Sequence, residues 1–124
     1  HRARAKIISV ATVNDDPLLV LSGCILATQK ILSQNNLKVS DVDLFEIHEA
    51  FASTMIHCQK ELKIDDAKLN VNGGCIALGH PMGATGSIMM STLIDELERK
   101  DFSTGIVATS GAAGAGTAML VERI

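Results

Sequence analysis

Three polar side chains stand where the chain is expected to reverse direction: His48, His80 and Ser110. An imidazole titrates near neutral pH, so either histidine could shuttle a proton or donate a hydrogen bond to a carbonyl oxygen that becomes an enolate. A serine hydroxyl ionises far above the ~8.5 of a cysteine thiol, which makes Ser110 a weak base. Strand ends are where open α/β sheets bind ligands, so we expect the three groups to converge on one site.

His80 lies in the stretch VNGGCIALGHPMGATG, residues 71–86, which holds half of the ten glycines of the chain. Pro81 restricts the backbone after His80, whereas Gly79 leaves it free before. A helix that begins near Gly83 would point its free N–H groups at this loop and favour developing negative charge there. The alternative is a surface turn whose glycines serve only tight packing.

Other kinds of site have less support. His48-Glu49 matches the first two residues of the zinc motif HExxH, but Ala52 stands where the second histidine ligand is needed. His57 and Cys58 add no known ligand spacing, so no metal site is expected and His57 is assigned to a helix surface. Residues 111–116 read GxxGxG, the reverse of the dinucleotide fingerprint, and precede a strand, which disfavours a Rossmann loop.

Composition narrows the class of protein further. The chain has 124 residues, of which 47% are hydrophobic, and a net charge of −3, which predicts one soluble globular domain without a nucleic-acid partner. No apolar run reaches the ~20 residues needed to span a membrane. Three cysteines without a CxxC pair (Cys24, Cys58 and Cys75) are expected as small core residues of a protein in a reducing intracellular compartment.

Apolar periodicity predicts alternating strands and helices. A buried strand is expected over residues 5–13, and further strands over 42–47, 105–109 and 117–121, with the last two joined by a long flexible connection, SGAAGAG. Helices are expected over 17–21, 22–34, 49–62 and 83–100, with Asp15 or Asp16 as a cap before Pro17. The order of these elements predicts an α/β fold with a mixed β-sheet covered by helices.

Three segments together resemble the C-terminal domain of thiolases, the acyl-CoA acetyltransferases: HEAFA at 48–52, NVNGGCIALGHPMGATG at 70–86, and the strand–SGAAGAG–strand ending. The resemblance spans residues 1–124 and implies one half of a two-domain thiolase fold within a longer protein. The N-terminal domain would carry the nucleophilic cysteine, so this chain alone is expected to be inert. Coenzyme A would be a substrate rather than a bound cofactor, and the protein a homo-oligomer.

The resemblance also implies a role for each residue of these loops. His80 would help to activate the nucleophilic cysteine and form part of an oxyanion hole. His48 is the first residue of the HEAF variant of the family's NEAF motif, and its imidazole would donate directly to that hole. Phe51 would border the pantetheine and acyl channel, and Met82 would lie close to His80.

Two departures from the family pattern leave the activity open. Ser110 stands where the family has the cysteine of a CxG motif, which acts as acid and base, and Ala112 replaces the glycine while keeping its N–H for a second oxyanion hole. The leading interpretation is a thiolase that cleaves 3-ketoacyl-CoA with CoA or runs the reverse condensation. The alternatives are a catalytically weakened acyl-CoA-binding protein and a condensing enzyme similar to ketoacyl synthases.

Overall fold

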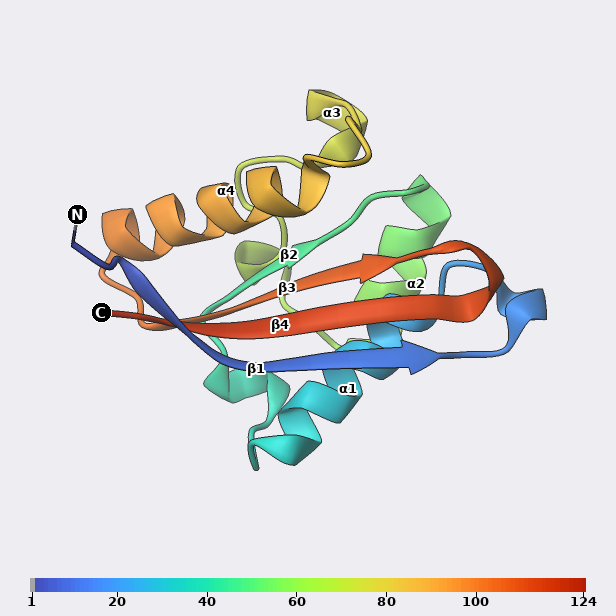
Figure 1. Cartoon of the computed structure of the whole chain (residues 1–124), viewed down its shortest axis with the longest axis horizontal. Coiled ribbons are helices and arrows are strands. Elements are labelled where there is room, and N and C mark those ends of the chain that lie inside the picture. The colour runs from blue at the N-terminus through green and yellow to red at the C-terminus, as the bar shows by residue number, and fades with distance from the viewer. Residues whose placement is uncertain (1) are drawn as a thin grey trace.

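The computed structural model describes residues 2–124 as a four-stranded mixed sheet with helices on both faces (Figure 1). The strands lie in the order β1-β4-β3-β2, where β4 is antiparallel to both of its neighbours and β2 is parallel to β3. The strand bounds are β1 Ala5–Asn14, β2 Leu44–Ile47, β3 Thr104–Ser110 and β4 Ala115–Arg123. The helices are α1 Gly23–Gln34, α2 Ala52–Leu62, α3 Cys75–Leu78 and α4 Thr85–Lys100.

Each face of the sheet has its own hydrophobic core because successive strand residues point to opposite sides. Phe45, Ile47 and Ile106 belong to the core shared with α1 and α2. Leu44 and Val107, their neighbours along the strands, belong to the core under α4. Figure 1 shows α4 and α1 on opposite faces, so the expected α/β layering is confirmed.

The helix periodicities are confirmed where they predicted buried stripes. Cys24, Ala27 and Ile31 of α1 are fully buried, as three residues of one helical face should be. The Asp16 side chain accepts a hydrogen bond from Leu18 N at 2.9 Å and caps a short 3₁₀ helix, Pro17–Leu19. No helix within residues 2–124 has both the length and the apolar character that a membrane crossing needs.

The expectation of a buried first strand is wrong. β1 pairs only with β4 and is an edge strand, so Ile7 and Val10 are 60% and 50% exposed, and of its ten residues only Ala11 is buried. The β-branched residues of this segment reflect strand propensity, which does not distinguish an edge strand from a central one.

The expectation of a long flexible connection between the last two strands is also wrong. β4 already begins at Ala115, and the link is a short 3₁₀ turn over Ala112–Gly114, held by Gly111 N donating to Ala115 O at 2.7 Å. Glycine at 116 is required because a Cβ there would overlap the Gly23 carbonyl of α1. The small residues therefore allow a close approach of strand and helix, not mobility.

Helix α2 begins at Ala52, three residues later than the expected Glu49. Phe51 precedes it with an extended backbone (φ −146°, ψ 156°), so its side chain is 63% exposed instead of lying on the buried face of the helix. His57 is exposed on α2, which confirms its assignment to a helix surface.

Candidate active site

His48 is held at the carboxyl end of β2. Its N–H donates to Ala108 O at 2.9 Å, which extends the parallel pairing of β2 and β3 by one residue. Asn70 holds the preceding peptide from the other side, because its Oδ1 accepts from Ile47 N at 2.8 Å and its Nδ2 donates to Ile47 O at 2.9 Å. The backbone that carries His48 is therefore fixed by two neighbouring segments.

Glu49 joins the loop of His48 to the glycine-rich loop. One carboxylate oxygen accepts from Ile76 N at 2.9 Å, and the other accepts from Asn70 Nδ2 at 3.2 Å. The loop approaches so closely that a Cβ at Gly74 would overlap the Glu49 carboxyl group. This close approach explains why the stretch around His80 needs a glycine at 74.

The ring of His80 is oriented by the first turn of α4. Its Nδ1 lies 2.7 Å from Thr85 Oγ1, and the Thr85 hydroxyl is 3.2 Å from Pro81 O. Since the hydroxyl proton is donated to the Pro81 carbonyl, Thr85 Oγ1 accepts from Nδ1–H of His80. A neutral imidazole with Nδ1 protonated keeps its lone pair on Nε2, so His80 is set up as a base.

His48 and His80 lie against each other although 31 residues separate them in the chain. Their ring centroids are 4.4 Å apart and their planes are tilted by 43°. Burial first, and then the neighbouring His80, lower the pKa of His48, so its imidazole is neutral at neutral pH. A neutral ring can donate one hydrogen bond to a developing oxyanion without carrying a buried charge.

Ser110 ends β3 and is 8% exposed. Its Oγ accepts a hydrogen bond from the Cys24 N–H at 2.9 Å, at the first turn of α1. The positive end of a helix favours negative charge at such an oxygen. The hydroxyl is thus fixed at a place where a thiolate would be better stabilised than an alkoxide.

All six residues that the sequence singled out line one cavity of about 640 Å³, the histidine cavity. His48, His80 and Ser110 are joined there by Phe51, Met82 and Ala112. Phe51 and Met82 are 63% and 83% exposed, whereas His48 is only 7% exposed. The remaining lining residues are Leu21, Ala50, Gly83, Thr85, Gly86, Thr109 and Gly111.

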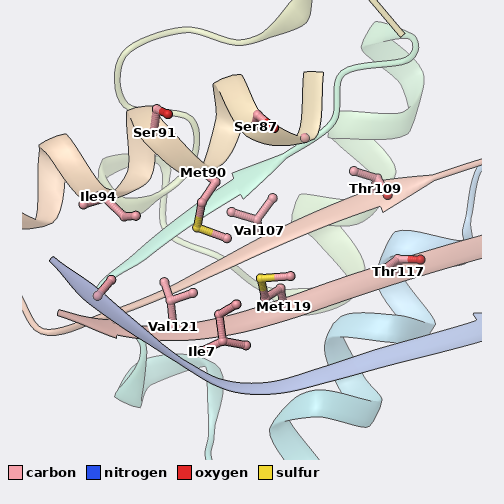
Figure 2. A pocket seen from close by; sticks show the side chains of 12 residues that line it. Ile7, Ser87, Met90, Ser91, Ile94, Val107, Thr109, Thr117, Met119 and Val121 are labelled. Atoms are coloured by element: carbon pink, nitrogen blue, oxygen red, sulfur yellow. The ribbon is translucent and has the colours of Figure 1, made fainter. Parts of the chain in front are cut away.

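A second cavity of about 620 Å³, the apolar groove, lies between α4 and the sheet (Figure 2). No residue that lines it carries a titratable side chain, so acid–base chemistry has no group to use there. Its lining residues are Ala5, Ile7, Gly86, Ser87, Met90, Ser91, Ile94, Val107, Thr109, Thr117, Met119 and Val121.

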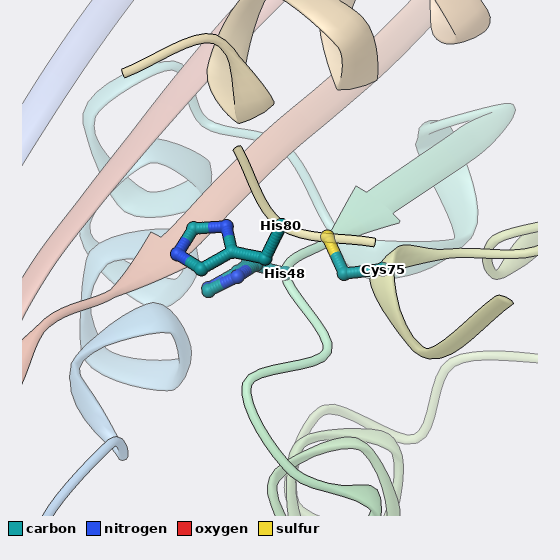
Figure 3. Close-up of side chains that lie close together, drawn as sticks. All are labelled: His48, Cys75 and His80. Carbon is teal, nitrogen blue, oxygen red and sulfur yellow. The ribbon is translucent and has the colours of Figure 1, made fainter. Parts of the chain in front are cut away.

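Two titratable groups near the histidines were not foreseen. Cys75 was expected in the core with Cys24 and Cys58, but it is only half-buried and lies beside His48 and His80 (Figure 3). Its position inside the glycine-rich loop was the available signal, since loop cysteines seldom pack in cores. The second group is Glu46, whose pKa is raised to about 8, first by burial and then by the charge of Glu49.

Comparison with known proteins identifies the fold and its class. The family model "Thiolase, C-terminal domain" matches residues 1–123. A 3-ketoacyl-CoA thiolase of Serratia proteamaculans is 42% identical over 99% of the chain, and a peroxisomal 3-ketoacyl CoA thiolase 1 of Petunia hybrida is 43% identical over 93%. The crystal structure of the Bacillus anthracis acetyl-CoA acetyltransferase superimposes with a TM-score of 0.93, at 35% identity and 99% coverage of the chain.

The chain belongs to the thiolase family and has the fold of its C-terminal domain. It spans 33% and 25% of the two curated relatives, and 31% of the Bacillus anthracis chain. These relatives include bacterial and peroxisomal proteins, which leaves the compartment of this chain unassigned.

Proposed function

We propose that the chain forms the C-terminal half of the active site of a thiolase that cleaves 3-ketoacyl-CoA with CoA, or condenses two acyl-CoA units in the reverse direction. The observation that carries the proposal is the meeting of His48, His80 and Ser110 around the histidine cavity. Family membership supports acyl-CoA and free CoA as the substrates, with no permanently bound cofactor.

In the proposed reaction, an N-terminal domain supplies the nucleophilic cysteine. By resemblance to the family, none of the three cysteines of this chain stands at the position of that nucleophile, and Cys24 and Cys58 are in addition fully buried. The lone pair on Nε2 of His80 takes the proton of that thiol as sulfur attacks the 3-keto carbonyl carbon. Thr85 keeps the ring in the tautomer that this step needs.

Cleavage of the bond between C2 and C3 leaves an acyl group on the cysteine and the enolate of the shorter acyl-CoA. The negative charge develops on the thioester oxygen, where His48 and the now protonated His80 donate hydrogen bonds. The lowered pKa of His48 keeps its ring neutral, and a neutral imidazole still carries one N–H that can donate to this oxygen. The N–H of Ala112 is proposed to donate to the oxyanion of the acyl-cysteine.

The enolate carbon must then receive a proton, and Ser110 or a water that it holds delivers it. The bond from Cys24 N fixes the Ser110 oxygen, and the N-terminus of α1 stabilises the negative charge left on it. Free CoA then attacks the acyl-cysteine: its thiol proton returns to the Ser110 oxygen, the bond between the acyl carbon and the cysteine sulfur breaks, and the departing thiolate takes back the proton held by His80, which releases the second acyl-CoA. The enzyme is proposed to act as a homo-oligomer in a reducing intracellular compartment, as three free cysteines suggest.

A second candidate is an acyl-CoA-binding protein with the same cavity and little turnover. The observation that favours it is Ser110, because a hydroxyl exchanges a proton with carbon far less readily than a thiol. A condensing enzyme similar to ketoacyl synthases would also explain two histidines without a second reactive cysteine. Its substrates would be carrier-bound acyl groups that lose carbon dioxide.

The test mixes the full-length protein with acetoacetyl-CoA and CoA and follows the loss of the enolate absorbance. Turnover supports the thiolase, and its absence with CoA still bound supports the binding protein. Ser110→Cys is expected to raise the rate by about 10-fold or more, since a thiol at the α1 N-terminus is a better acid and base. Ser91→Cys, in the apolar groove, is the matched control and should change nothing.

A further inference from the structure

Three ligand-bearing side chains from separate segments meet at the edge of the histidine cavity. A ring nitrogen of His48, a ring nitrogen of His80 and the sulfur of Cys75 all lie within 4.8 Å of one another. Figure 3 shows the two imidazoles together and the Cys75 thiol beside them, each delivered by a different part of the backbone. The proposed reaction uses the two histidines and leaves the thiol without a role.

His48 contributes to this cluster a buried polar atom that no described residue binds. The residue is only 7% exposed, and its Nε2 has no hydrogen-bond partner among residues 2–124. A buried ring nitrogen without a partner is costly, so a ligand that binds it gains stability from the contact.

We propose that Cys75, His48 and His80 form a reversible binding site for a thiophilic divalent cation such as Zn²⁺, and that an ion bound there blocks the histidine cavity. One thiolate and two neutral imidazoles are ligands that Zn²⁺ prefers, and three protein ligands leave a fourth position for water. The blocking effect rests on the proposed function, because the ion would occupy the nitrogens needed for proton transfer and oxyanion binding.

The ligand atoms need only a small movement to bind. Bonds of 2.0–2.3 Å in a tetrahedral zinc site place ligand atoms about 3.3–3.7 Å apart, so spacings of up to 4.8 Å must shrink by at most about 1.5 Å. The glycine-rich loop can supply that shift, because Gly73 and Gly79 have φ of 81° and 89° and the space around the Cα of Gly79 is open. Ligation also releases the Cys75 thiol proton to solvent, which leaves a zinc-bound thiolate.

The surrounding charges favour a cation over an isolated thiolate. The Glu49 carboxylate binds Ile76 N, next to Cys75, and Glu46 lines a small cavity together with Cys75. Burial raises the pKa of the Cys75 thiol, and the charge of Glu49 adds to this effect. The Glu49 carboxylate attracts a divalent ion at the cluster, whereas Glu46, with its pKa raised to about 8, is mostly protonated and uncharged near neutral pH.

Metal binding can be measured without any turnover. The full chain is titrated with Co²⁺, which gives a near-ultraviolet thiolate charge-transfer band only when sulfur is a ligand, and bound Co²⁺ is then displaced with Zn²⁺. Cys75→Ala should abolish the band and weaken Zn²⁺ binding by about 10- to 100-fold or more. His57→Ala removes an exposed histidine of α2 and is the matched control, which should leave both unchanged.

Inhibition is the second readout. Zn²⁺ should stop turnover of acetoacetyl-CoA in the full-length protein, a chelator should restore it, and Cys75→Ala should keep its basal rate while becoming resistant. Unchanged Zn²⁺ affinity in Cys75→Ala, or loss of binding in His57→Ala, would overturn the site. A thiolate band without inhibition would overturn the blocking effect, whereas a band in a protein with no turnover at all would count only against the proposed function.

Discussion

The histidine cavity and the apolar groove are nearly equal in volume, about 640 and 620 Å³, yet they differ in the chemistry they can support. The histidine cavity lies where β2 and β3 end, and its polar groups come from the loops that follow these strands. The apolar groove is lined by residues of the strands and of α4, whose side chains point into it at the regular spacing of strand and helix. Reactive groups gather where the regular backbone stops, because only there can side chains of several segments turn toward one point.

The sharpest way to test this difference is to remove one group from each cavity of the full-length protein. His80→Ala should lower the rate of the proposed 3-ketoacyl-CoA cleavage by about 10³-fold, because it removes the proposed base and one of the proposed oxyanion donors. Ser91→Ala removes a hydroxyl from the apolar groove and should leave the rate within about 2-fold. Equal losses in the two variants would remove the distinction between the cavities.

A substitution of Glu46 tests whether this buried acid affects the free energy of unfolding rather than the reaction in the histidine cavity. Its side chain is 4% exposed and its pKa is raised from 4.5 to about 8, so the folded state binds more protons than the unfolded state between those values. Stability should therefore fall by about 2–3 kcal/mol as the pH rises from 5 to 7. Glu46→Gln should flatten this dependence in urea titrations.

The exposed Glu61 of α2 provides the control for that measurement. Glu61→Gln should keep the steep pH dependence of the unchanged chain. A stability curve that is equally steep in Glu46→Gln would show that other groups produce it.

The contact between Gly116 of β4 and Gly23 of α1 should tolerate a larger side chain less well than the open position of Gly86 does. A Cβ at Gly116 would overlap the Gly23 carbonyl, so Gly116→Ala should destabilise the fold by about 2–3 kcal/mol. Gly86 lines both cavities in the first turn of α4 with nothing within 4 Å, so Gly86→Ala should be neutral or stabilise by up to about 0.5 kcal/mol. Thermal unfolding compares the two, and similar shifts would contradict the close contact.

The smallest expected effect concerns the turn beside Ser110. Ala113 has φ 57° and ψ 34°, a left-handed conformation that costs alanine energy and glycine none. Relief of this strain in Ala113→Gly should stabilise the folded chain by about 0.5–1 kcal/mol. The greater conformational entropy of glycine in the unfolded state should offset part of this gain. Ala115→Gly, at φ −60°, should instead lower the unfolding temperature. A loss of stability in both variants would mean that the turn is not strained.

Particular elements show how far sequence reasoning reached. The period of Cys24, Ala27 and Ile31 predicted the buried face of α1 because helix geometry follows directly from residue spacing. The exposure of β1 escaped prediction, since an edge strand and a central strand share the same composition. The turn after Ser110 escaped as well, because Gly114 lies close to Asp15 and Gly116 close to Gly23 of α1, and these contacts join distant segments.

The amino-acid sequence by itself determined the thiolase family, the order of strands and helices, and the loops that carry His48, His80 and Ser110. These properties follow from local patterns and from motif spacing along the chain. Only the tertiary structure decided that Thr85 orients His80, that Cys24 fixes the Ser110 oxygen, and that Cys75 joins the two histidines. Such contacts depend on distances of a few ångströms between remote segments, which packing sets and no local pattern records.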